Sequence, residues 1–172
     1  MTRVLINFTI QFILLVLAQV LILNHINFGG YVNPYLYVIF VLSLPFDTPK
    51  WALLTLAFLL GLSVDIFSGV MGLHTAATVF MAFCRPGVLR FVSTKDLTIK
   101  GGSPSIQQLG FNWFFSYSFI LVLIHHLLYF YLEVFHFSGF FYTLFRVILS
   151  LIFTLIFIFI FQYIFHPSKR KA

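Results

Sequence analysis

Residues 140–165 read FFYTLFRVILSLIFTLIFIFIFQYIF, and Arg146 is the only charged side chain in this run. The hydrocarbon core of a lipid bilayer is about 30 Å thick, and a helix of about 20 apolar residues crosses it. The run is therefore long enough and apolar enough to span a membrane as a helix. This one stretch predicts an integral membrane protein, and the other apolar runs of the chain agree with it.

The composition extends this prediction to the whole chain. Of the 172 residues, 61% are hydrophobic and 20% are aromatic, whereas 8% are charged. A soluble domain is about 45–50% apolar and about 25% charged, so the composition argues against a water-soluble enzyme. The aromatic content argues against disorder. We expect an all-α bundle of membrane-spanning helices in which residues 1–172 form a single integral membrane domain.

Hydropathy and length divide the chain into six predicted spans. Their approximate bounds are residues 4–23, 33–44, 51–68, 71–91, 111–132 and 140–165. The second span is the shortest; Asn33-Pro34 begins it, because proline suits the first turn of a helix, and Pro45 and Pro49 bound it. This segment can be tilted, broken or partly re-entrant.

The distribution of basic residues predicts the orientation of these spans. With the N-terminus in the cytoplasm, six spans place every Lys and Arg except Arg146 on the cytoplasmic side, which follows the positive-inside rule. Five spans would put the basic tail outside. The sequence therefore predicts a multi-pass membrane protein with both termini in the cytoplasm. The cytoplasmic basic residues are Arg3, Lys50, Arg85, Arg90, Lys95, Lys100, Lys169, Arg170 and Lys171.

Sequence motifs of catalysis and cofactor binding are not found. There is no phosphate-binding GxxxxGK[ST] or GxGxxG, and no HExxH or GxSxG. The acidic residues occupy separate segments, which argues against hydrolysis by paired carboxylates. Cys84 is the only cysteine, and no Cys/His cluster has the spacing of zinc ligands. We expect no enzymatic activity, no cofactor, no metal and no nucleic-acid partner.

Polar side chains inside the predicted spans are the candidate functional residues, because a charge in hydrocarbon is costly and usually faces other helices or water. Gly61 and Asp65 share one side of the third span, where small residues let a neighbouring helix approach. At about 1.5 Å per residue, Asp65 and Arg146 lie at similar depths, so we expect them to pair in one polar layer. On the side of Arg146 lie Ser150 and Thr154. The other predicted members of the layer are Gln19, His74, His125 and His126.

This polar layer has three interpretations. Its side chains can hydrogen-bond between helices and hold the bundle together. They can instead contact a partner helix or a ligand. A proton or ion path is the third possibility, although only one acidic residue is buried and no relay is evident.

Residues 61–74 read GLSVDIFSGVMGLH. This stretch resembles the signature of the rod shape-determining protein MreD family, which has a Gly-Leu-x-x-Asp segment, a small or polar turn, and a Gly-Leu pair that opens the next helix. Asn33-Pro34 in a short second span also fits the family pattern, as do size, hydropathy and the basic tail. The residues that match the signature are Gly61, Leu62, Asp65, Ser68, Gly69, Gly72 and Leu73.

The resemblance implies a non-enzymatic role in bacterial cell elongation. Members of this family lie in the cytoplasmic membrane beside MreC, a single-span protein with a large external region. They belong to the machinery that links MreB filaments to peptidoglycan synthesis by RodA and a class B penicillin-binding protein. The implied fold is a six-helix bundle similar to the substrate-binding subunits of energy-coupling factor vitamin transporters. The long cytoplasmic loop at residues 85–110 departs from the pattern.

Two hypotheses of function follow. In the first, a tight Ser68-Gly69 turn and a close approach at Gly72 make a rigid hairpin that presents a docking surface to a partner helix. Asp65→Ala would then weaken partner recovery more than it lowers the protein level, and equal loss of both would make Asp65 structural. In the alternative, the chain is the substrate-binding membrane subunit of a vitamin importer, which needs an outward pocket lined by aromatic and polar side chains.

Overall fold

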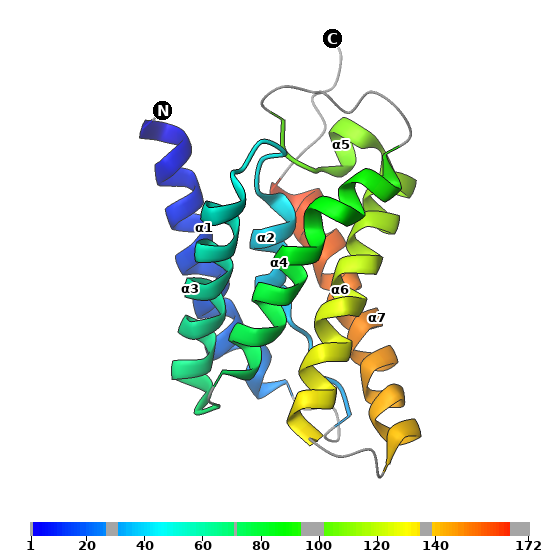
Figure 1. Ribbon diagram of the computed structural model, residues 1–172. Helices are drawn as coiled ribbons and strands as arrows, with labels where there is room; N and C mark the ends of the chain where they lie inside the picture. The colour runs from blue at the N-terminus through cyan, green and yellow to red at the C-terminus, as the bar shows by residue number, and fades with distance from the viewer. Residues whose placement is uncertain (1, 27–30, 71, 94–101, 135–138, 166–172) are drawn as a thin grey trace.

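The structure, a computed structural model, describes residues 2–26, 31–70, 72–93, 102–134 and 139–165, with side chains from residue 6 onward. Every regular element in these ranges is a helix (Figure 1). In chain order the α-helices and the short 3-10 helices (η) are α1 (Thr2–Leu21), η1 (Leu23–His25), η2 (Leu36–Val38), α2 (Ile39–Ser43), α3 (Lys50–Ser68), α4 (Leu73–Val92), α5 (Ile106–Leu109), α6 (Phe111–Val134) and α7 (Phe140–Phe165).

Five helices of the described ranges are long and apolar enough to cross a membrane, namely α1, α3, α4, α6 and α7. The predicted class, an all-α bundle of membrane helices, is therefore confirmed. Their bounds differ from the predicted spans by a few residues. α4 begins at Leu73 rather than at residue 71, because Gly72 has a φ of 81° and cannot belong to a right-handed helix.

The predicted span 33–44 is a broken segment and not one continuous helix. Residues 32–35 form no regular element, and η2 and the five-residue α2 follow. Figure 1 shows this segment passing between the long helices, from the end of the bundle where α1 finishes to the end where α3 begins. The side chains of residues 37–42 are at most 2% exposed. The segment is therefore enclosed by protein along its helical half.

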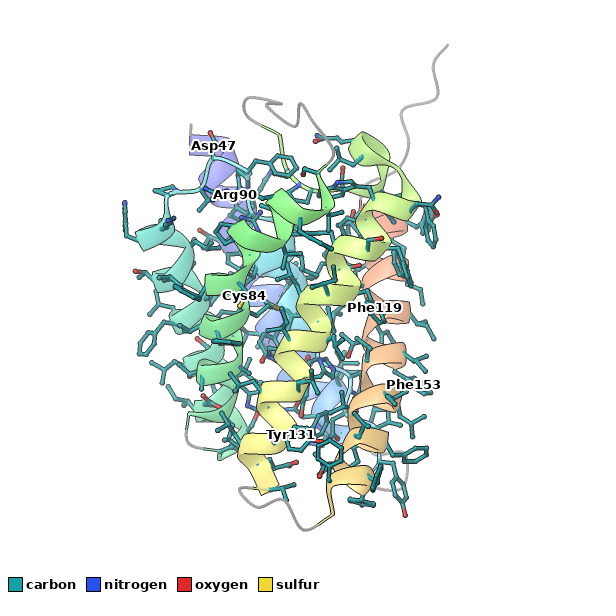
Figure 2. All side chains as sticks on the ribbon, turned by 45° about the vertical axis from the view of Figure 1, so that its right-hand side comes forward. Asp47, Cys84, Arg90, Phe119, Tyr131 and Phe153 are labelled. Carbon is teal, nitrogen blue, oxygen red and sulfur yellow. The ribbon has the colours of Figure 1, made fainter. Side chains whose placement is uncertain are left out.

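The two ends of the bundle differ in charge. α1 begins and α7 finishes at the same end, which is the upper end in Figure 1. Lys50 and Arg90 lie there too, and Figure 2 shows Arg90 and Asp47 near it. We call this the basic end. Lys95, Lys100 and the predicted basic tail (Lys169, Arg170, Lys171) lie outside the described residues.

The outward face of α7 is apolar, and its inward face carries apolar side chains together with the polar Ser150 and Thr154. Val147, Leu151, Leu155 and Ile158 are buried in the bundle, whereas Ile148, Ile152, Ile156 and Ile160 point outward and are 46–49% exposed. A row of apolar side chains on the face that points away from the bundle is unfavourable in water and favourable in lipid. The outward face of α7 is thus suited to lipid.

The α3–α4 pair packs closely at Gly61. A Cβ atom added to this glycine would lie 2.5 Å from the Cα of Thr75 and 2.8 Å from the carbonyl oxygen of His74. The predicted approach at Gly72 is wrong, because a Cβ there would meet nothing within 4 Å. What Gly72 and Gly69 supply instead is a positive φ, of 81° and 67°, at the two ends of the turn.

We predict that Gly61→Ala destabilises the protein by about 1–3 kcal/mol, because the added methyl group overlaps the backbone of α4. Gly87→Ala is the matched control in α4, since its Cβ would meet nothing within 4 Å. Alanine is the better helix former by about 0.8–1.0 kcal/mol, so this variant should unfold at the same or a higher temperature. Thermal unfolding in detergent measures both, and equal midpoints for the two variants would contradict the close contact.

Candidate functional site

Asp65, near the end of α3, binds the first turn of α4 through both carboxylate oxygens. Oδ1 accepts hydrogen bonds from the backbone N–H (3.0 Å) and the Nδ1–H (2.9 Å) of His74. Oδ2 accepts from the backbone N–H (2.9 Å) and the hydroxyl (2.5 Å) of Thr75. The first N–H groups of a helix have no partner within it, and an acidic group beside them is favourable. Asp65 therefore caps α4 from the neighbouring helix.

This contact explains why the glycines and the aspartate of residues 61–74 occur together. α4 has no side-chain cap of its own and no acidic residue in its first turn, so the cap has to come from α3. Gly61, one turn before Asp65, lets the start of α4 come near enough to be capped. Gly69 ends α3 in the left-handed conformation. The motif residues thus build one helical hairpin.

The remaining motif residues lie around this hairpin. The hydroxyl of Ser68 accepts a hydrogen bond from the side-chain amide of Asn24 (2.8 Å), which ties the turn to the chain that follows α1. Leu73 is half-buried against the core. Leu62 lines an apolar groove on the outer face of α3 and α4.

The predicted pair of Asp65 and Arg146 is not formed. Arg146 donates to the carboxylate of Glu133 (2.8 Å), and its guanidinium carbon lies 4.7 Å from the ring centre of Phe130. The carboxylate of Asp65 is occupied by His74 and Thr75. Depth along two helices says nothing about direction around them, and Arg146 points to the end of α6 and not to α3. The prediction was wrong for this reason.

The broken segment obtains its backbone hydrogen bonds from side chains of α1 and α7. Gln19 donates from Nε2 to the carbonyl of Pro34 (3.0 Å) and accepts at Oε1 from the N–H of Tyr37 (3.4 Å). The hydroxyls of Ser150 and Thr154 accept from the N–H groups of Asn33 and Tyr35, at 3.0 Å each. Unpaired backbone groups at membrane depth are costly, so non-helical chain occurs there only where protein surrounds it. These three polar side chains supply partners to four backbone groups of the segment.

Two buried histidines of α6 extend this network. Nδ1 of His126 lies 2.9 Å from the carbonyl of Val122, so it carries the proton, and Nε2 accepts from the hydroxyl of Thr154 (3.1 Å). Nε2 of His125 lies 2.7 Å from the hydroxyl of Tyr37. That hydroxyl also lies 3.1 Å from Oγ1 of Thr78. His125 and His126 are adjacent in the sequence, yet their side chains bond different residues.

The structure brings four of the six residues of the predicted polar layer into contact with the broken segment, namely Gln19, His74, His125 and His126. Tyr35 is the common neighbour, because its ring centre lies 5.3–5.7 Å from those of His74, His125 and His126. Gln19 bonds the same segment, and Asp65 joins through His74. Arg146 stands apart with Glu133.

Arg85 is a site residue that sequence reasoning missed, since it counted only as a cytoplasmic charge. The side chain is 1% exposed. Its guanidinium donates to the carbonyl of Leu44, just after α2, and to the hydroxyl of Tyr117 (2.8 Å). Tyr117 donates in turn to the carbonyl of Leu42 (3.1 Å). Arg85 and Tyr117 together satisfy the last carbonyl groups of α2. The last carbonyls of a helix have no partner within it, so the short helix followed by Pro45 is the feature of the sequence that indicates a need for such donors.

A cavity of about 380 Å³ opens at the end opposite to the basic end. His74, Tyr35 and Tyr129 form part of its wall, and the ring centres of His74 and Tyr129 are 4.6 Å apart. Its polar rim includes Asn24, Asn33 and Ser68. Among the described residues no group of three or more His, Cys, Asp or Glu could hold a metal ion. The cavity can therefore offer hydrogen bonds and aromatic surface to a ligand.

The apolar helices place the chain in the class of multi-pass helical membrane proteins. No family model matches the chain, and no curated protein or solved structure is similar to it.

We predict that Gln19→Leu lowers the unfolding temperature strongly. The substitution removes the partners of the Pro34 carbonyl and the Tyr37 N–H, and each buried group left unpaired costs about 1–3 kcal/mol. The same change at Gln107, which is exposed on α5, is the matched control and should have little effect. Thermal unfolding in detergent compares them. A Gln19→Leu protein as stable as the control would show that the segment does not depend on this side chain.

We predict that Asp65→Ala lowers stability and partner recovery together, because the carboxylate is 3% exposed and both oxygens bind α4. Loss of a helix cap costs about 0.5–2 kcal/mol. Asp65→Asn keeps one acceptor oxygen and should lie between wild type and alanine. Membrane protein level and unfolding temperature measure the effect. Normal stability with a selective loss of a partner would contradict the capping role.

Proposed function

We propose that this protein is a non-enzymatic membrane scaffold of the bacterial cell elongation machinery, similar to the MreD family. The observation that carries the proposal is residues 61–74, whose Gly-Leu-x-x-Asp sequence and following glycines match the family signature. In the structure these residues form one capped hairpin. The matched residues therefore belong to a single structural unit, which supports treating the motif as more than a product of apolar composition.

The proposed topology has six crossings with both termini in the cytoplasm. The broken segment of residues 31–44 supplies the second crossing. About five irregular residues at up to about 3.3 Å each, followed by eight helical residues at about 1.5–2 Å each, are enough to cross about 30 Å of hydrocarbon. The start of α1 and the finish of α7 at the basic end support this orientation (Figure 1).

The proposed partner is an MreC-like protein with a single membrane helix, and α1 is the helix most open to it. Only 22% of the residues in the span of α1 are buried, against 33–44% in the other four long helices. A groove of about 590 Å³ runs between α1 and α7, from Asn7 and Gln11 on one wall to Phe161 and Phe165 on the other. A transmembrane helix with a polar residue at this depth would fill it.

Gln11 gives the groove its specificity in this proposal. Its Nε2 is buried and has no hydrogen-bond partner in the described part of the chain. An amide donor without a partner in hydrocarbon is unfavourable, and polar side chains hold membrane helices together by bonding across them. Because Nε2 is covered by this chain, the Gln11 amide has to turn toward the groove for a partner helix to accept from it, and such a bond would correct this deficiency. Through such a partner the scaffold would join the RodA-like polymerase, the class B penicillin-binding protein and, indirectly, MreB.

A second candidate function is the substrate-binding subunit of an energy-coupling factor vitamin importer. The specific observation in its favour is the cavity of about 380 Å³ beside His74, Tyr35 and Tyr129. With the proposed topology it opens outward, and its aromatic and polar wall is of the kind that small-molecule sites have. The family signature of residues 61–74 favours the scaffold over this alternative.

We predict that Gln11→Leu reduces recovery of an MreC-like protein several-fold while the protein level stays unchanged. The assay is a gentle-detergent pull-down of the tagged protein from native membranes, read by mass spectrometry. Ser116→Leu is the control, because Ser116 is exposed on α6 and bonds only the backbone of its own helix. It should recover the same partners as wild type.

The other outcomes separate the two candidates. Recovery of paired ATPases and a second transport subunit would overturn the scaffold and favour the importer. Equal recovery of the MreC-like protein by Gln11→Leu and Ser116→Leu would keep the scaffold and exclude this groove as its docking site.

A further inference from the structure

A pocket of about 260 Å³ lies between the start of α3 and the end of α4, at the basic end. Lys50 contributes from α3 and Arg90 from α4, so two cationic side chains from different helices reach one pocket. Its inner wall is apolar, formed by Leu53, Leu54, Ala82, Phe83 and Pro86, with Gly87 beside them.

Neither cation is neutralised within the described part of the chain. Lys50 and Arg90 are exposed, and no hydrogen bond or ion pair of theirs occurs among the described residues. Asp47 lies at the same end (Figure 2), and it too forms no ion pair there. The pocket therefore offers two positive charges above an apolar wall.

The depth of the pocket is that of a membrane–water interface. Trp51, next to Lys50, is 73% exposed, and Phe91, next to Arg90, is 81% exposed. Tryptophan is enriched at the level of the lipid headgroups. The two cations thus lie where the phosphate groups of a bilayer lie, and the apolar wall lies on the hydrocarbon side.

An apolar groove of about 670 Å³ lies next to the pocket along the seam of α3 and α4. Leu54 and Phe83 line both the pocket and the groove, so the two adjoin at these side chains. On α3 the groove extends from Leu54 to Leu62, about 12 Å at 1.5 Å per residue. This length is close to one leaflet of a hydrocarbon core about 30 Å thick.

We propose that this pocket and groove bind one anionic phospholipid of the leaflet at the basic end. The lipid phosphate lies between Lys50 and Arg90, and one acyl chain lies along the groove from Leu54 toward Leu62. Basic residues near a membrane surface attract anionic headgroups, and a shape that combines two cations with a chain-length groove favours a lipid over a free phosphate. The inference is independent of the proposed scaffold function.

Gly87 allows a test that leaves both charges in place. It lies in the pocket wall, its φ is not positive, and a Cβ there would meet nothing within 4 Å. Gly87→Leu therefore fills the space of the ligand without disturbing α4, and leucine is the better helix former. The charge variant is Lys50→Gln/Arg90→Gln, and Lys169→Gln/Arg170→Gln removes the same number of charges from the tail, outside the described residues.

The experiment is native mass spectrometry of delipidated full-length protein titrated with phosphatidylglycerol. Phosphatidylcholine with the same acyl chains and glycerol 3-phosphate serve as comparison ligands. We expect the wild type to bind one phosphatidylglycerol in preference to both. Lys50→Gln/Arg90→Gln should weaken this binding by about thirtyfold. Gly87→Leu should weaken it at least as much as the loss of one of the two cations would. The tail variant should bind as wild type does.

Three results would overturn the site. Equal binding of phosphatidylglycerol and phosphatidylcholine would remove the role of the cations. Equal weakening by the tail variant would show diffuse attraction to the net positive charge. Unchanged binding in Gly87→Leu would show that no lipid enters the pocket.

Discussion

The backbone of residues 31–44 has to find hydrogen-bond partners inside an apolar bundle, and the arrangement of the long helices depends on this requirement. Gln19 of α1 and the hydroxyls of Ser150 and Thr154 of α7 serve its first half. Arg85 and Tyr117 serve the carbonyls at its finish. In hydrocarbon no water can replace these partners. The helices α1, α4, α6 and α7 are therefore held around one broken segment by polar contacts as well as by packing.

The α3–α4 hairpin also contains backbone groups that need partners from a side chain of another element. The first amides of α4 lie at the end of the bundle opposite to the basic end, and the Asp65 carboxylate satisfies them from the helix before. This finding changes what the Gly-Leu-x-x-Asp sequence means for function. Asp65 is buried and holds the hairpin together, so a partner protein has to contact other residues. In the proposed function these lie in the groove of α1 and α7, where the Gln11 amide lacks a partner.

Most of the polar network is thus explained by the structure it holds together. Thr154 joins Tyr35 to His126, and Tyr37 joins His125 to Thr78. His74 differs, because it binds Asp65 on one side and borders the open cavity on the other. His74 is therefore the residue of the network best placed to contact a ligand. It links the α3–α4 hairpin to the cavity on which the second candidate function depends.

The sequence alone determined the class of the protein, because apolar length and composition depend on nothing but the order of residues. It also identified Asp65, Gln19 and the histidines of α6, since polar groups in apolar runs need partners wherever they point. It could not determine which partner each one has. Asp65 and Arg146 share a depth but point to different neighbours, and Arg85 was indistinguishable from a surface cation. Direction around a helix and the path of an irregular segment are set by contacts between residues far apart in the chain, so only the tertiary structure decided them.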